Sequence, residues 1–260
     1  MSPEVLPAES RAAAQDGVLL VDKPAGLTSA GVVRVLKARL KPKKIGHGGT
    51  LDPFATGLLV VLIGKATKLS SLFLDGEKSY SGVIRLGIGT DTEDITGTET
   101  ASDPDIADRF PEKIWQQTIE KIRQVFLGEI EQTPPVYSAL KVQGKRSYDL
   151  ARQGVAVEHK PRRVQIFELQ IAFRNPTELT FYVRCSKGTY IRSLARDIGK
   201  FLGTHACLES LRRESSSGFE LRETAKLDDI SKESLEGQLM SAPLILERLA
   251  HKTTASASQA

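Results

Sequence analysis

The sequence predicts an α+β fold with a largely antiparallel mixed sheet flanked by helices, and three observations support this prediction. Segments with strand character outnumber those with helical periodicity, and several strands follow one another directly, as in antiparallel sheets. A doubly wound parallel fold would need regular alternation of strands and helices, which the chain lacks. With 260 residues, 40% of them hydrophobic, the chain can bury a core without disulfides or metal ions.

The first predicted elements are a strand, a basic helix and a second strand. Apolar residues 18–21 run into the turn 22–26 and predict a strand. Thr28 or Ser29 is suited to cap the helix that follows. A second buried strand is expected at 58–63. Six cations and no acid occupy the helix and the residues after it: Arg34, Lys37, Arg39, Lys41, Lys43 and Lys44.

The remaining elements lie between residues 80 and 240. Residues 80–86 alternate like a half-exposed strand, whereas the acidic, turn-rich segment 91–105 predicts a surface loop. The other expected elements are a helix (114–126), three strands (136–142, 164–173, 179–185), a helix (190–202) and a closing turn with a helix (227–240).

The ends and the composition suggest a single cytoplasmic domain. Residues 1–15 and 249–260 are expected to be a disordered leader and tail, which leaves one domain over 16–248. The leader lacks the apolar core of a secretory signal, and no apolar run reaches membrane-spanning length. Cys185 and Cys207 have no zinc-ligand spacing, which favours a reduced cytoplasmic chain. The net charge of +4 is compatible with a polyanionic partner.

Several familiar motifs are incomplete, so the chemistry that they supply is not expected. Residues 64–67 lack the first glycine and the correctly placed Ser/Thr of a phosphate-binding P-loop. Ser138 and Lys141 fit the S-x-x-K pattern of penicillin-binding enzymes, but the accompanying motifs are missing. The four histidines show no metal-ligand spacing. We therefore expect neither a metal nor a cofactor.

A glycine-rich loop followed by a single carboxylate, residues 44–57, is the segment suited to chemistry. Gly46, Gly48 and Gly49 allow the backbone to approach a ligand closely. Asp52 follows and is held by a proline. The alternative is a tight turn in which Asp52 only caps the next segment.

Two later segments supply groups that complement a carboxylate. Tyr80 lies at the start of a strand, and Tyr190 and Arg192 follow a glycine turn at the start of a helix. An arginine would keep Asp52 ionised and aimed, and a tyrosine offers a stacking face for a planar ring. Spacing along the sequence does not show that these groups meet.

The loop sequence GHGGTLDPFATGLL, starting at Gly46, resembles the signature loop of the TruB family, the bacterial tRNA pseudouridine-55 synthases. The resemblance covers residues 16–222 and implies the pseudouridine synthase catalytic fold. After Phe219 the chain is too short for the C-terminal PUA domain of many family members, so we expect that domain to be absent. Further segments resemble family motifs in the same order: 17–26, 80–94, 135–145, 148–154, 185–192 and 211–213.

The resemblance implies isomerisation of uridine to pseudouridine at position 55 in the T-loop of tRNA, with the target nucleotide flipped into a pocket. Asp52 would be the catalytic nucleophile, and whether it attacks or deprotonates the sugar stays open. Arg192 would pair with Asp52, and Tyr80 would stack on the base. The other implied substrate contacts are Lys23 supporting the loop, His47 touching the tRNA arm, and Tyr190 and Leu211 lining the uracil pocket. Ordinary turn or core roles are the alternatives for His47, Tyr190 and Leu211.

The expected partner is the T-arm of tRNA, with no obligatory protein partner and a monomeric chain. Two other functions remain open. One is a tRNA-binding or RNA-folding module whose catalysis is secondary or lost. The other is a guide-dependent synthase in a ribonucleoprotein, which the expected lack of a PUA domain disfavours.

Overall fold

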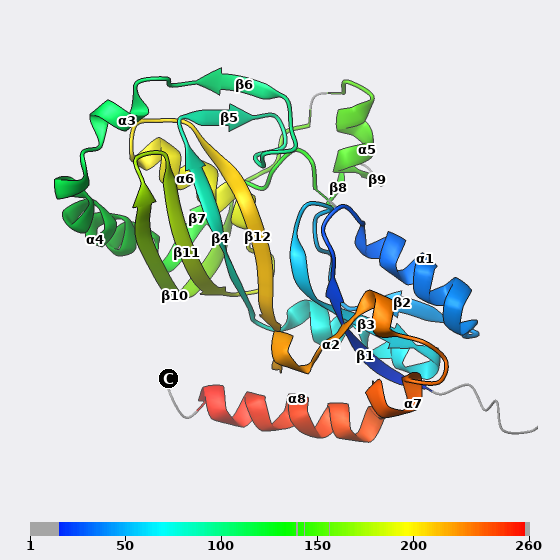
Figure 1. Cartoon of the computed structure of the whole chain (residues 1–260). Helices are drawn as coiled ribbons and strands as arrows, with labels where there is room; N and C mark the ends of the chain where they lie inside the picture. Colours follow the sequence, from blue (N-terminus) through cyan, green and yellow to red (C-terminus); the bar gives the residue numbers. More distant parts are fainter. Residues whose placement is uncertain (1–15, 139, 143, 156, 258–260) are drawn as a thin grey trace, which may run out of the picture. The chain divides into compact units, whose positions relative to one another are not determined.

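The structure is a computed structural model that describes residues 16–257 except 139, 143 and 156 (Figure 1). Within these residues, no helix has the length and apolar character needed to cross a membrane. The predicted domain of residues 16–248 comprises two compact units. Among the described residues, unit 1 is 16–75 with 216–257, and unit 2 is 76–215. The predicted disordered leader, 1–15, lies outside the described residues.

Unit 1 is built on a mixed sheet around the antiparallel strands β1 (Gly17–Lys23) and β3 (Thr56–Ile63). Strand β2 (Ile45–His47) pairs antiparallel with β3. The other edge of β1 carries β14 (Ala225–Lys226), which is parallel, and β15 (Leu239–Met240), which is antiparallel. Both apolar strands predicted here are confirmed.

Both faces of the unit 1 sheet are covered, which explains why β1 and β3 appear in the sequence as unbroken apolar runs. On one face Val21 packs in a cluster with α1 (Ser29–Leu40), the predicted basic helix. On the other face Val18 packs in a cluster that includes Phe73 of α2 (Ser70–Asp75) and Ile245 of α8 (Ala242–Ala257). The 3₁₀ turn η2 (Gly64–Leu69) and α2 were not predicted.

Helix α8 extends into the segment that was predicted to be a disordered tail. Residues 249–257 continue the helix. The helix is anchored before this point, because Ile245 is fully buried and Arg248 lies 4.6 Å over the Phe219 ring and pairs with Glu223. Extending an anchored helix adds one hydrogen bond per residue, and the alanines in this segment have high helix propensity.

Within unit 2, five strands are paired in the order β12–β4–β11–β10–β7. The β4–β11, β11–β10 and β10–β7 pairs are antiparallel, as the fold class predicts. The strand bounds are β12 (Ala206–Ser216), β4 (Lys78–Leu86), β11 (Glu178–Cys185), β10 (Arg162–Asn175) and β7 (Gly128–Gln132).

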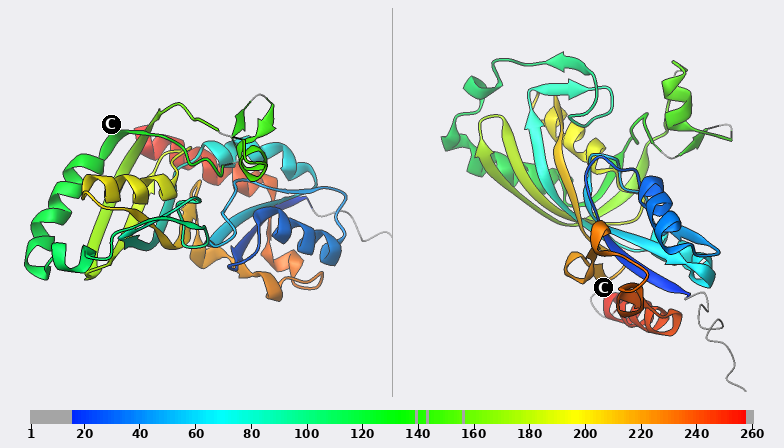
Figure 2. Two further views of the ribbon diagram at one scale, coloured as in Figure 1. Left: turned by 90° about the horizontal axis from the view of Figure 1, so that it is seen from above. Right: turned by 45° about the vertical axis from the view of Figure 1, so that its right-hand side comes forward.

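Helices α4 (Trp115–Phe126) and α6 (Ile191–Phe201) lie on the same side of this sheet (Figure 2). The Trp115 ring is 5.3 Å from the Phe173 ring on β10, which joins α4 to the buried face. Both helices were predicted. The smaller elements are β5 (Ile88–Thr90), β6 (Glu99–Ser102), α3 (Ile106–Arg109), η3 (Glu112–Ile114), β8 (Lys141–Val142), β9 (Lys145–Arg146) and α5 (Ser147–Arg152).

Two predictions for unit 2 are wrong. The strand expected at 136–142 is confined to the two residues of β8, because Ser138 N–H turns back to donate to the Val136 carbonyl. The acidic segment 91–105 is not a loop throughout, since it contains β6, which pairs with β5. The short α7 (Leu235–Gln238), with the 3₁₀ turns η4 (Leu221–Glu223) and η5 (Leu227–Asp229), forms the predicted closing region of unit 1.

Candidate active site

The loop that carries Asp52 is fixed by hydrogen bonds within unit 1. Gly48 N–H donates to the Val60 carbonyl at 2.9 Å, which ties the loop to β3. Leu51 makes two bonds with the buried Ser29 side chain: its N–H donates to Oγ at 2.8 Å, and its carbonyl accepts from Oγ at 3.1 Å. The residue next to Asp52 is therefore bonded to the first turn of α1. Thr28, rather than Ser29, caps that helix by accepting the Gly31 N–H.

Lys23 forms a second link to this loop. Its side chain is 0% exposed, and its Nζ donates to the carbonyls of Pro24 (2.8 Å), Leu27 (2.7 Å) and Pro53 (3.2 Å). Gly26 N–H donates to the same Pro53 carbonyl at 2.8 Å. Burying an ammonium is costly unless its donors are used, so these bonds hold the 24–27 turn against the residue that follows Asp52. Support of the loop is the role that the resemblance implies for Lys23.

Two of the three glycines of the loop, Gly48 and Gly49, are required by the structure of the loop itself. A Cβ on Gly48 would lie 2.7 Å from Cβ of Phe73, too close for any side chain. Gly49 has φ +139°, a conformation that favours glycine. Gly46 has open space around its Cα. The sequence predicts that these glycines let the backbone approach a ligand. At Gly48 the structure gives another reason, which is close packing against α2.

Asp52 and His47 are both half-buried. His47 is the last residue of β2, opposite Val61 of β3, and it begins the loop that Asp52 ends. Asp52 is followed by a turn in which Ala55 N–H donates to the Asp52 carbonyl at 3.2 Å. Unit 1 thus holds Lys23, His47 and Asp52 on one continuous framework.

Unit 2 holds the other predicted site residues. Tyr80 lies on β4 opposite Val183 of β11 and is 8% exposed. Leu211 on β12 is buried. Tyr190 is half-buried at the N-terminus of α6, with the Arg162 guanidinium 4.7 Å over its ring. Tyr190 therefore packs against a cation and not only against apolar core.

Arg192 lies in the first turn of α6 and is 4% exposed. Its Nη1 donates to the Thr92 carbonyl at 2.7 Å and its Nη2 to the Tyr137 carbonyl at 2.9 Å. Its Nε lies 3.9 Å from the Asp94 carboxylate. The described contacts of Arg192 therefore come from two segments, 92–94 and 137, that converge on the start of α6.

The neighbouring turn of α6 contacts the same acidic segment. Arg196 pairs with Glu93, and Ser193 Oγ donates to Glu93 Oε2 at 3.0 Å. Burial raises the pKa of the Glu93 carboxyl, while the Arg196 guanidinium acts in the opposite direction. Glu93 and Asp94 are not predicted as site residues, because an acidic, turn-rich segment is typical of a solvated loop. The available signal was the pair Arg192 and Arg196, spaced to lie on one face of α6.

The predicted site residues therefore fall into two groups. Unit 1 contains Lys23, His47 and Asp52, and unit 2 contains Tyr80, Tyr190, Arg192 and Leu211. The predicted pairing of Asp52 with Arg192 joins the two units and stays a prediction.

The basic helix requires one correction. Arg39 is one of the six cations noted in the sequence as a basic cluster suited to RNA phosphates, but its Nη1 donates to the carbonyls of Leu227 (2.6 Å) and Ile230 (2.8 Å). Arg39 therefore fastens α1 to the C-terminal segment of unit 1. Arg34 and Lys37 are exposed on the same helix.

The two cysteines are buried and unsuited to nucleophilic chemistry. Burial raises the pKa of the Cys185 thiol to about 12 and that of the Cys207 thiol to about 11. Both remain protonated near neutral pH, and a thiol is a weak nucleophile compared with a thiolate. Among the described residues, no cluster of three or more His, Cys, Asp or Glu side chains is placed to hold a metal ion.

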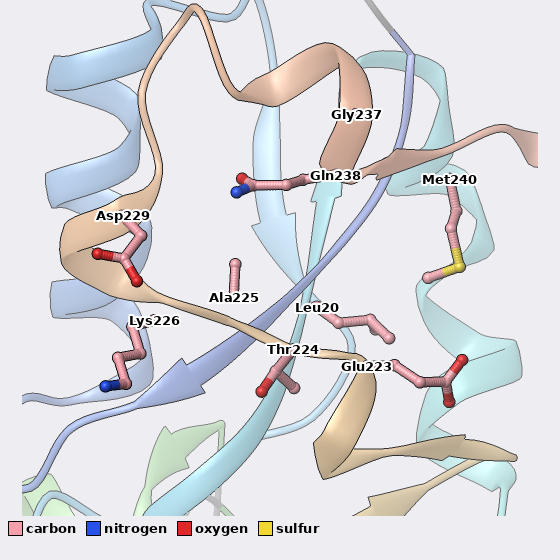
Figure 3. Close-up of a pocket in the computed structure, with 9 residues that line it drawn as sticks. All are labelled: Leu20, Glu223, Thr224, Ala225, Lys226, Asp229, Gly237, Gln238 and Met240. Atoms are coloured by element: carbon pink, nitrogen blue, oxygen red, sulfur yellow. The ribbon is translucent and has the colours of Figure 1, made fainter.

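A hollow of about 590 Å³ lies at the edge of β1, where Leu20 is flanked by the pairings of β14 and β15 (Figure 3). None of the predicted site residues lines it. It belongs to the closing region of unit 1 and not to the Asp52 loop. Its lining residues are Leu20, Glu223, Thr224, Ala225, Lys226, Asp229, Gly237, Gln238 and Met240.

Comparison with solved structures finds a similar fold in chains of two complexes. The chain is 30% identical to a chain in the crystal structure of a Cbf5–Nop10–Gar1 complex, with a TM-score of 0.63. The match covers 85% of this chain and 56% of that one. An H/ACA RNP structure bound to a substrate RNA containing 2′-deoxyuridine gives 27% identity and a TM-score of 0.60, covering 87% of this chain and 56% of that one.

The sequence comparisons identify the family. The model of the TruB family pseudouridylate synthase (N terminal domain) matches residues 37–191. A relative from Azoarcus sp. (strain BH72), named tRNA pseudouridine synthase B, is 43% identical over 82% of this chain and 69% of its own length. The enzyme of that name from Bordetella avium (strain 197N) is 43% identical over 85% of this chain and 89% of its own. The chain belongs to the TruB family of pseudouridylate synthases, as the loop motif predicted.

Proposed function

We propose that this protein converts uridine to pseudouridine at position 55 in the T-loop of tRNA, with Asp52 as the nucleophile. The single observation that supports this assignment best is the Asp52 loop, which carries the family signature and is tied to β3, α1 and Lys23. A carboxylate held in this way costs little reorganisation when it meets a substrate.

The reaction requires only rearrangement of bonds. The bond from N1 of uracil to C1′ of the ribose breaks, the uracil turns, and C5 bonds to C1′. C5 then loses its proton and N1 ends with one, so no atom or electron is gained or lost overall. Asp52 can serve either by attacking the nucleoside or by taking a proton from the sugar.

The other site residues have proposed roles that follow the family resemblance. Arg192 pairs with Asp52 and orients its carboxylate, and Tyr80 stacks on the flipped uracil. Tyr190 and Leu211 line the uracil pocket. His47 contacts the tRNA arm as the nucleotide leaves its stack, because a base inside a folded loop is inaccessible to Asp52.

The exposed cations of α1 are the proposed contacts to tRNA phosphates. Arg34 and Lys37 lie on a helix without acidic residues, in the same unit as the Asp52 loop. Phosphate contacts of this kind position the RNA and carry no sequence information.

The comparisons favour tRNA over a guide-dependent substrate. Relatives named tRNA pseudouridine synthase B are 40–44% identical to this chain, whereas the chains of the Cbf5-containing and H/ACA structures are 27–30% identical. We therefore propose that the protein acts on tRNA without a guide RNA, in the cytoplasm.

The test of the nucleophile is the Asp52→Asn variant. An amide of the same size keeps the loop bonds, which involve backbone groups, but it cannot attack or accept a proton as a carboxylate does. We expect no pseudouridine product, with the dissociation constant for tRNA within about threefold of the parent value. Appreciable turnover by this variant would remove Asp52 from the mechanism. A parent protein that binds tRNA but forms no product would instead favour an RNA-binding module.

A further inference from the structure

Helix α6 begins without a side-chain cap of its own. Tyr190 occupies the N-cap position, with φ −99° and ψ 113°, and its side chain caps no backbone N–H. A helix that starts at a buried site needs other partners for its terminal backbone groups. Arg192 lies in the first turn of this helix, so these partners also set the place of its guanidinium.

The side chain of Gln132, the last residue of β7, supplies partners for the backbone groups of Tyr190. Its Oε1 accepts the Tyr190 N–H at 2.8 Å, and its Nε2 donates to the Tyr190 carbonyl at 3.0 Å. Gln132 is 1% exposed. A buried amide that uses both a donor and an acceptor on one residue fixes that residue's position in two directions, as a backbone pair in a sheet does.

The residues after Gln132 continue this attachment along α6. The Thr133 carbonyl accepts from Ser193 Oγ and from Arg196 Nη2, each at 3.0 Å. The Tyr137 carbonyl accepts from Arg192 Nη2 at 2.9 Å. The segment 132–137 therefore runs against the first turns of α6. Of the bonds between this segment and the helix, those of Gln132 lie closest to the start of the helix.

We propose that Gln132 is a positioning residue for the reaction, acting by fixing the start of α6 and with it Tyr190 and Arg192. Gln132 has no role in the chemistry assigned above, and the inference rests on the proposed function of Tyr190 and Arg192. Gln132 would affect the reaction rate by setting the positions of Tyr190 and Arg192. Misplacing a site group by about 1 Å costs on the order of 100-fold in rate.

Two substitutions of Gln132 separate positioning from folding. Gln132→Met keeps the length and apolar volume but removes both bonds. Gln132→Glu keeps the acceptor for Tyr190 N–H, but when ionised it sets a carboxylate oxygen against the Tyr190 carbonyl. Protonation of that glutamate restores one donor, and burial favours protonation.

Asn175→Ala is the matched control. The Asn175 side chain also uses both ends of its amide, donating to Glu178 Oε2 and accepting the Thr177 N–H, each at 3.0 Å. It does so in the turn between β10 and β11 and not at α6. The control therefore removes a comparable set of bonds from the same unit without touching the start of the helix.

The experiment measures single-turnover rate and tRNA affinity for the four proteins, together with hydrogen exchange of the amides of residues 190–194. For Gln132→Met we expect the rate to fall by about 30- to 100-fold, with the dissociation constant for tRNA within about threefold of the parent value. The amides of 190–194 should exchange at least about tenfold faster. For Gln132→Glu, the rate relative to the parent should rise as the pH falls from about 8 to about 6. Asn175→Ala should show none of these changes.

Three outcomes would overturn the inference: a Gln132→Met rate within about twofold of the parent, a loss of rate equal to that of Asn175→Ala, or unchanged exchange at 190–194. If the parent forms no pseudouridine on any tRNA, the proposed function fails separately. The exchange measurement then still decides whether Gln132 fixes the start of α6.

Discussion

The two parts of the candidate site are held by different kinds of interaction. In unit 1 the Asp52 loop is fixed through backbone groups, with Lys23 bonded to carbonyls and Ser29 bonded to both backbone groups of Leu51. In unit 2 the start of α6 is fixed mostly through side chains, with Arg192 reaching two carbonyls and Asp94. The loop therefore combines two polar side chains, Lys23 and Ser29, with close packing at Gly48, whereas the start of α6 depends mainly on polar side chains.

This difference predicts which substitutions damage each part. A conservative exchange of a polar group should be most harmful at α6, since each guanidinium or amide there makes bonds in diverging directions. A single added methyl group should be most harmful at the Asp52 loop, since the backbone there approaches neighbouring side chains closely. Surface charge on α1 should matter least.

Arg192→Lys is expected to have the largest of these effects. Lysine keeps the charge, but its single ammonium replaces a planar fork that reaches the carbonyls of Thr92 and Tyr137 together. We expect the single-turnover rate to fall by about 100-fold. Arg85→Lys is the control, because Arg85 pairs with Glu178 (2.7 Å) and Glu209 (3.0 Å) in the same unit, away from α6. Near-normal activity of Arg192→Lys would mean that charge alone suffices at this position.

Gly48→Ala should have the next largest effect. The added Cβ would lie 2.7 Å from Cβ of Phe73, and neither atom is at the end of a flexible side chain. We expect the free energy of unfolding to fall by about 1–3 kcal/mol, measured by denaturant titration, with a loss of activity from the displaced loop. Gly46→Ala is the matched control two residues earlier, where the added methyl group meets open space. Equal effects of the two substitutions would refute the packing explanation.

Neutralising α1 should have the smallest effect on turnover and a specific effect on binding. In the double variant Arg34→Gln/Lys37→Gln, the slope of log affinity for tRNA against log salt concentration should become shallower by about 1–2. Arg39 is left intact, because it bonds the 227–230 segment and its loss would disturb folding. Lys113→Gln/Lys121→Gln makes the same change of charge at exposed positions in unit 2. A slope that is unchanged, or changed equally by both pairs, would place the phosphate contacts elsewhere.

The same contrast explains how much could be predicted from the sequence. The unit 1 framework is visible because its elements are short-range: two apolar strands, a capped helix and a glycine-rich loop lie within residues 17–63. The reason for Gly48 was not visible, because Phe73 lies 25 residues further along the chain, on a helix that the sequence did not indicate.

Unit 2 was harder to predict because its contacts are distant in sequence. Arg192 and Ser193 are joined to residues about 60 and 100 positions earlier, and no local pattern shows such a pairing. Strand β12 was missed because its charged residues, which include Glu209 and Glu214, conceal the alternation of a strand. Both of these carboxylates bond to β4, Glu209 with Arg85 and Glu214 with Ser81.

We propose that this protein makes pseudouridine at one position of tRNA. The most direct test is incubation of the purified protein with an unmodified tRNA transcript, followed by mapping of pseudouridine at single-nucleotide resolution. A second transcript with cytidine at position 55 serves as the control. We expect one product, at position 55, in the first transcript and none in the second. Pseudouridine at other positions only, or in neither transcript despite binding, would contradict it.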